Sequence, residues 1–181
     1  MKLSFLNKTQ IARLLLVFLS FLSTNGNSQT CSPVATINED FSSFSAGVDM
    51  FPVNCWGFIK DPSNLLGAMA YIGDDGATTP NNVAAMTGNV NYPGGRYLVS
   101  PQLSTLNGNY HLKFDAKLLS SLGTGSTLEV GTLDSQTSAA NFIAVGNPLS
   151  LTTTYQTFTI VLPATTGHQY FAIKLNPGGN I

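Results

Sequence analysis

The feature that most constrains the fold of this 181-residue chain is a series of short β-prone runs, each closed by turn-forming residues. The run Arg96–Ser100 is the clearest example, because it follows the cluster Pro93-Gly94-Gly95 and stops at Pro101. Glycine adopts backbone angles that other residues resist, and proline has no amide hydrogen with which to continue a central sheet. This punctuation predicts a strand that enters a sheet in one register and ends abruptly.

Runs of the same kind recur along the chain, and no long stretch shows helical periodicity. Four runs alternate clearly between apolar and polar residues: 110–117, 126–133, 155–163 and 169–175. Weaker strand candidates are 34–38, 56–60, 69–72, 83–86 and 141–146. Many short strands with polar turns and no intervening helices predict an all-β fold, an antiparallel sandwich or barrel.

The alternation also predicts which residues face the core. In the run 110–117 one face carries Tyr110, Leu112, Phe114 and Ala116, and the other carries His111, Lys113, Asp115 and Lys117. A period of two places the first set in the core and the second in water. In the run 155–163 both faces carry apolar residues, so we expect that strand to be covered on both sides.

The first 28 residues have the pattern of a secretory signal peptide. Lys2, Lys8 and Arg13 precede a continuous apolar run, 14–23, and small polar residues follow, with a cut expected ahead of Gln29. The apolar run is too short for a membrane-spanning helix, which needs about 20 apolar residues. A lipid anchor at the following cysteine is not expected, because the residues before it are Ser-Gln-Thr.

The remaining chain, residues 29–181, is the size of one domain. The signal region holds three of the eight basic residues and none of the nine acidic ones. Residues 29–181 therefore contain five basic and nine acidic residues, and their net charge is 5 − 9 = −4. With no basic patch, we expect no nucleic-acid partner. Charged residues make up 9% of the chain, far below the usual quarter, which leaves few groups for acid–base chemistry.

The chain has two cysteines, Cys31 and Cys55. Outside the cytoplasm such a pair is readily oxidised, and a loop of this length gives about 3 kcal/mol of stabilisation. We therefore predict a disulfide between them, with two buried free thiols as the alternative. A zinc site is not expected, because His111 and His168 are distant and have no ligand spacing.

Eight segments in order resemble the choice-of-anchor J or cleaved-adhesin domains, which are similar to MAM domains. The segments begin with EDFSSF, FPVNCW, TTPNNVAAM and RYLVSPQL, and continue with YHLKFDAK, STLEVGTLDSQTSAANFIAVG, YQTFTIVLP and YFAIKL. The resemblance covers nearly all of the chain after the signal region. It implies a jelly-roll β-sandwich of the concanavalin or galactose-binding sort, export, often with a C-terminal type IX sorting module, and no shared catalytic residues.

Two adjacent pairs of acids are candidates for a structural calcium site: Glu39 with Asp40, and Asp74 with Asp75. Carboxylates and backbone carbonyls are the hard oxygen ligands that calcium prefers. The resemblance favours the first pair, near the N-terminal strand, and composition favours the second, in the turn GDDGATTPNN. The alternative for each pair is an ordinary solvated turn.

Trp56, the one tryptophan, is a candidate for stacking on a sugar ring, with Asn54, Asp61 and Asn64 near it in sequence to bond the hydroxyls. The alternative is that its indole lies in the core. Catalysis is not expected, because no G-x-S-x-G motif is present and Glu129, the one glycosidase candidate, alternates with apolar residues on what reads as a solvated face.

These features favour a secreted, non-catalytic surface module for adhesion or carbohydrate binding, with a glycan or a cell-surface protein as partner. The alternatives are an accessory domain of a secreted hydrolase or peptidase, and a structural spacer in a larger surface protein. The last residues, KLNPGGNI, end on a turn signal followed by one apolar residue. We therefore expect a closing strand beyond Ile181.

Overall fold

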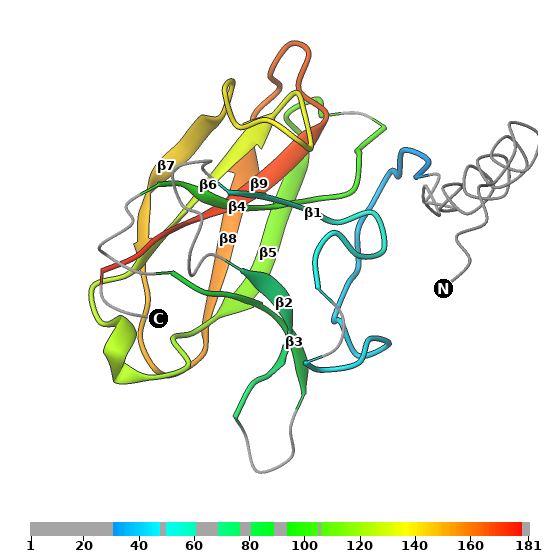
Figure 1. Ribbon diagram of the computed structural model, residues 1–181. Coiled ribbons are helices and arrows are strands. Elements are labelled where there is room, and N and C mark those ends of the chain that lie inside the picture. Colours follow the sequence, from blue (N-terminus) through cyan, green and yellow to red (C-terminus); the bar gives the residue numbers. More distant parts are fainter. Residues whose placement is uncertain are drawn as a thin grey trace, which may run out of the picture. The chain divides into compact units, whose positions relative to one another are not determined.

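Among the residues that the structure describes, nine antiparallel strands make up most of the regular structure (Figure 1). The computed structural model describes residues 31–47, 50–60, 69–76, 81–88, 94–104 and 106–178. The strands are β1 (Gly57–Lys60), β2 (Ala70–Asp74), β3 (Asn82–Met86), β4 (Arg96–Val99), β5 (Tyr110–Ala116), β6 (Thr127–Leu133), β7 (Ile143–Ser150), β8 (Gln156–Leu162) and β9 (Tyr170–Asn176), with one 3₁₀ turn, η1 (Ser121–Gly123). The prediction of an all-β antiparallel fold is confirmed. In these ranges no helix is long and apolar enough to cross a bilayer.

The strands form one large sheet and two small ones. The main sheet has five strands in the order β1-β4-β9-β6-β7, and the two-stranded sheets are β2-β3 and β5-β8. β9, red in Figure 1, lies between β4 and β6 and pairs with both along their lengths. Three of the four pairings in the main sheet therefore join strands that are distant in sequence, and most of its order depends on long-range register.

The core lies between the inner face of the main sheet and the two smaller sheets. Leu98, Val130 and Ile173 point inward from β4, β6 and β9, and they belong to one apolar cluster with Phe114 of β5 and Ile160 of β8. Ile72 of β2 is fully buried in the same cluster. Residues 31–181 form one compact unit, in which all three sheets share this core.

The strand predicted at 96–100 begins and ends as its punctuation indicates. β4 starts at Arg96, directly after Gly95, and it ends before Ser100 and Pro101. A Cβ atom at Gly95 would lie 2.5 Å from Cε2 of Tyr97, so any larger residue here would displace that ring. The amide of Ser100 still donates to the carbonyl of Phe171, 3.0 Å away, so the ladder to β9 ends in order at the proline.

The prediction of a strand at 34–38 is wrong. Among the described residues it makes one isolated parallel bridge, between Val34 and Leu103. β7 in turn runs four residues beyond the predicted end and includes Pro148. β7 is the last strand of the main sheet and pairs there with β6 alone, and an edge position tolerates a residue without an amide hydrogen.

The predicted faces are confirmed for β5 and corrected for β8. In β5 the residues expected in the core, from Tyr110 to Ala116, all pack against the main cluster, and the alternate residues of the strand are exposed. Lys117, also expected in water, is half-buried against the ring of Tyr155. In β8 the outward residues Thr157, Thr159 and Val161 are exposed, and Val161 keeps 54% of its surface in solvent. The expectation that β8 is covered on both sides was wrong, because it pairs with β5 and presents its outer face to solvent.

A disulfide fastens the N-terminal segment to the start of β1. Cys31 and Cys55 are bonded, with their Cα atoms 5.6 Å apart, which confirms the predicted bridge. The Gln136 side chain crosses the same region, since its amide nitrogen lies within hydrogen-bond distance of the Cys55 carbonyl and donates to the Ser100 carbonyl at 2.9 Å. This amide therefore joins the start of β1 and the end of β4 to the loop after β6.

Candidate functional site

The outer face of the main sheet carries a row of four side chains in register across four strands. Ile59 of β1 faces Tyr97 of β4, Tyr97 faces Lys174 of β9, and Lys174 faces Glu129 of β6. Side chains alternate along a strand, and the neighbours of these residues point into the core. The four side chains, which we call the outer row, therefore point away from it.

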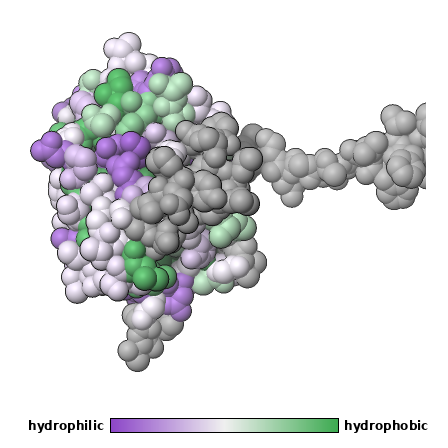
Figure 2. Space-filling view, turned by 60° about the vertical axis from the view of Figure 1, so that its left-hand side comes forward, coloured by the Kyte–Doolittle hydropathy of each residue, from purple (hydrophilic) through white to green (hydrophobic). Residues whose placement is uncertain are grey.

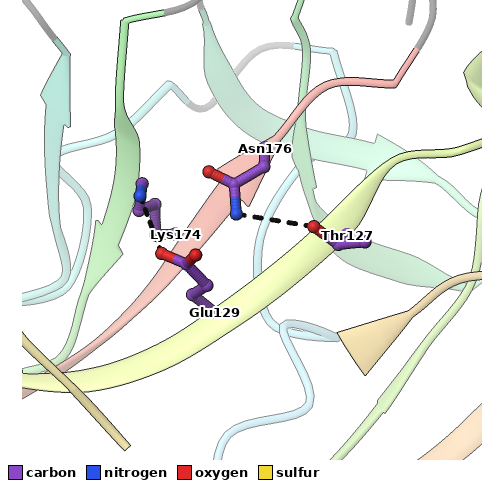
Figure 3. A network of polar contacts seen from close by, with 4 residues as sticks. All are labelled: Thr127, Glu129, Lys174 and Asn176. Atoms are coloured by element: carbon purple, nitrogen blue, oxygen red, sulfur yellow. Dashed lines mark hydrogen bonds and ion pairs between the residues drawn. The ribbon is translucent and has the colours of Figure 1, made fainter. Parts of the chain in front are cut away.

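The polar end of the outer row is an ion pair. The ammonium nitrogen of Lys174 lies 2.7 Å from Oε2 of Glu129, and each side chain keeps 23% of its surface exposed. In the next rung Asn176 Nδ2 donates to Thr127 Oγ1 at 3.4 Å. Figure 3 shows the two pairs side by side, each bridging β6 and β9. The face thus offers a cation, a carboxylate, an amide and a hydroxyl within two rungs of the sheet.

An apolar wall adjoins the outer row. The rings of Tyr97 and Phe142 meet edge to face, with centroids 5.1 Å apart. Phe142 lies directly over Gly131, where any side chain would collide with its ring. Beneath these rings Leu133 is fully buried, in a second small apolar cluster that includes Tyr97 and Phe142 at its border. The wall is therefore held by packing.

The combination of these groups suits a polar, uncharged ligand. Lys174 donates only, the carboxylate of Glu129 accepts only, and the Asn176 amide does both. Hydrogen bonds that involve an ionised partner are stronger than neutral ones. The edge of a half-buried tyrosine adds apolar contact beside them. The outer row thus places a few polar groups beside an apolar wall on the surface of the sheet.

The predicted calcium pair Glu39 and Asp40 is engaged by its own turn. Glu39 Oε1 accepts from the amide of Phe41 at 2.8 Å, and Asp40 Oδ1 accepts from the amide of Ser42 at 2.9 Å. The backbone and side-chain hydrogen bonds from Ser42 lower the pKa of Asp40 below its usual value. The carboxylates thus stabilise the turn, in which Phe41 has a positive φ of 60°.

The second pair, Asp74 and Asp75, is also engaged. Asp74 Oδ1 accepts from the amide of Gly76 at 2.7 Å. Asp75 is 3% exposed, and its carboxylate accepts from the backbone and side-chain amides of Asn81, both at 3.3 Å, and from the Tyr155 hydroxyl at 3.4 Å.

A lysine supplies the positive charge in the Asp75 loop. Lys117 Nζ donates to the Asp75 carbonyl oxygen at 2.6 Å and lies 4.7 Å above the ring of Tyr155. An ammonium thus occupies one of the oxygens that this loop could offer to a calcium ion. Within the described ranges no group of three or more His, Cys, Asp and Glu side chains is placed to hold a metal. Oxygens of both pairs thus already accept hydrogen bonds, and calcium binding there would require these contacts to change.

Trp56 lies in the core, the alternative that the sequence left open. Its indole is 6% exposed and packs 5.5 Å from the ring of Phe41 and 5.8 Å from that of Phe171. The indole offers no open face to a sugar, whereas Asn54 beside it is exposed. The other two residues of this prediction, Asp61 and Asn64, lie outside the described residues.

The histidines do not form a catalytic arrangement. His111 is exposed on the outer face of β5, and His168 is buried with its Nδ1 2.8 Å from Oγ1 of Thr132. Thr132 is fully buried, so its hydroxyl is closed to a substrate. The two buried side chains thus meet each other's hydrogen-bonding need in the core.

No family model matches the chain, and no curated protein matches it. On the face shown in Figure 2 many of the coloured residues are pale, with strongly hydrophilic and strongly hydrophobic residues in separate patches. In a chain with only 9% charged residues the Lys174–Glu129 pair is a distinctive feature. Sequence reasoning did not single out Lys174, because only the β6–β9 register brings it to Glu129.

Proposed function

We propose that this chain is an exported, non-catalytic surface module that binds carbohydrate on the outer face of its main sheet. Export is supported by the signal-like first 28 residues and by the disulfide, since such bonds persist in oxidising compartments. Carbohydrate binding is supported above all by the outer row, where Tyr97, Lys174 and Glu129 place an aromatic edge, a donor and an acceptor in register.

We further propose a jelly-roll arrangement of the strands. The order of the main sheet requires long connections between neighbouring strands, as in Greek-key folds. A core shared with the β5-β8 pair supports two layers. The resemblance to choice-of-anchor J and cleaved-adhesin domains points the same way, toward adhesion at a cell surface. The part of the outer face that a ligand can reach is the end at Lys174 and Glu129, where each side chain keeps 23% of its surface exposed.

Binding to a glycan array tests the function, with Tyr97→Ala and Lys174→Met as the site variants. We expect the native protein to bind a subset of glycans and both variants to lose at least tenfold in affinity. Lys113→Met is a matched control, because Lys113 lies on the exposed outer face of β5, away from the main sheet. Thermal melting verifies that each variant is folded.

The outcome separates the proposal from its alternatives. Equal binding by Lys174→Met and Lys113→Met would remove the outer face as the site. A protein that binds no glycan at all would leave the accessory domain of a secreted hydrolase or peptidase, and the structural spacer, as the remaining hypotheses.

A further inference from the structure

We infer that the outer row selects neutral sugars with adjacent free hydroxyls over acidic sugars. The inference rests on the proposed function and names its ligand class. It begins with the charge of the site: Lys174 contributes one positive charge and Glu129 one negative charge, 2.7 Å apart. The neighbouring pair, Asn176 and Thr127, carries no charge. The described polar end of the outer face is therefore electrically balanced.

The geometry of the ion pair matches two neighbouring hydroxyls. One hydroxyl can accept from the Lys174 ammonium while the next donates to the Glu129 carboxylate, because a hydroxyl has both a donor and acceptor lone pairs. The two oxygens of a vicinal diol are separated by about the length of a hydrogen bond, as are the Lys174 nitrogen and the Glu129 oxygen. Both contacts are charge-assisted, so each is stronger than a bond between neutral groups.

An acidic sugar is disfavoured by the same pair. A ligand carboxylate could reach Lys174 only by competing with Glu129, whose own negative charge lies beside it. Like charges at hydrogen-bond distance repel each other strongly in a partly shielded site. Glu129 therefore acts as the residue that excludes anions, and Tyr97, facing Lys174 across β4 and β9, supplies apolar contact to the sugar ring.

Glu129→Gln tests this assignment. The variant keeps the length and hydrogen-bonding capacity of the side chain and removes its charge, which leaves the Lys174 ammonium free to bind an anion. We expect the native protein to bind at least one neutral hexasaccharide of mannose, glucose or galactose at least tenfold more tightly than hexagalacturonate. We expect Glu129→Gln to reverse this preference, and Lys174→Met to weaken both classes of ligand.

Controls distinguish failure of the inference from failure of the proposed function. Asp115→Asn is the matched change of an acid to an amide on the exposed face of β5, and it should leave the preference unaltered. Native protein that prefers hexagalacturonate, with binding lost in Lys174→Met, would overturn the neutral-sugar inference and keep the site. Glu129→Gln with native preference would also overturn it. Absence of binding to every probe would overturn the proposed function itself.

Discussion

The indole of Trp56 meets the ring of Phe171 nearly edge-on, with centroids 5.8 Å apart and ring planes at 79°. Phe41 packs against the same indole from the N-terminal segment. The side chain of Trp56, the residue before β1, thus connects that segment to the central strand β9. Edge-to-face contacts of this kind add to the stabilisation that burial alone provides.

Trp56→Ala is expected to lower the free energy of unfolding by about 3–5 kcal/mol, the usual cost of emptying a large aromatic site. Trp56→Phe should cost less, because it retains a ring against Phe171. Urea denaturation followed by circular dichroism measures both changes. A Trp56→Ala variant as stable as the native protein would contradict the core position of the indole.

Replacing both Cys31 and Cys55 with serine is expected to reduce stability by about 3 kcal/mol, because the bond closes a loop of 24 residues in the unfolded chain. Denaturant unfolding of the native and double-variant proteins gives the difference. Peptide mapping without reductant should recover the two cysteines in one linked fragment. Recovery of both as free thiols would count against the bridge.

Gly131→Ala is expected to destabilise the protein by about 1–3 kcal/mol, since the new methyl group would collide with the ring of Phe142 and the carbonyl oxygen of Ile143. The double variant Gly131→Ala, Phe142→Ala tests the cause. Removing the ring opens part of the space, so the double variant should be less destabilised than the sum of the single ones. Additive effects would show that Phe142 does not cover this position.

Calcium is expected to leave the thermal midpoint unchanged, because the Asp75 carbonyl oxygen already accepts from Lys117 and the carboxylates already accept hydrogen bonds. Melting in millimolar calcium and in EDTA measures the effect. An ion that binds only the native state would raise the midpoint. Should a shift occur, Asp40→Asn and Asp75→Asn would identify the pair responsible.

Stability is expected to fall at alkaline pH in part through Tyr155. Burial of its hydroxyl, followed by the negative charge of Asp75, raises the pKa of Tyr155 above its usual value near 10.0. A raised pKa in the folded state contributes stability below pH 10 that is lost as the pH rises through the folded pKa. Melting between pH 8 and pH 11 should show a smaller alkaline loss for Tyr155→Phe than for the native protein. Identical profiles would exclude this contribution.

Sequence alternation predicted the strands well where one face is buried and the other wet. It identified the core face of β5 residue by residue, because that strand lies on the rim of the core with solvent outside. It gave a wrong prediction for the outer face of β8, where Val161 is apolar and yet exposed. Apolar residues on an outer face are common in folded proteins, and composition alone cannot tell them from covered ones.

The outer row could not be predicted from the sequence, for a different reason. Glu129 and Lys174 are each recognisable as outward residues of an alternating strand, yet 45 residues separate them. Their contact follows from the register of β6 against β9, which is a property of the complete sheet. Trp56 shows the converse case, since polar neighbours in sequence made the indole a candidate for solvent while tertiary packing placed it against Phe171.

The disulfide described at the start of β1 also determines how the protein carries mechanical load. A pull on the chain ahead of Cys31 has a short covalent path through the sulfur–sulfur bond to Cys55 and β1, which bypasses most of residues 32–54. The first contacts to be loaded are the hydrogen bonds of Gln136 to the carbonyls of Cys55 and Ser100, and then the β1–β4 ladder. Reduction would transfer the load to residues 32–54, whose own contacts, including the Val34–Leu103 bridge, would have to break first, and a single-molecule pulling record would register their release as added length.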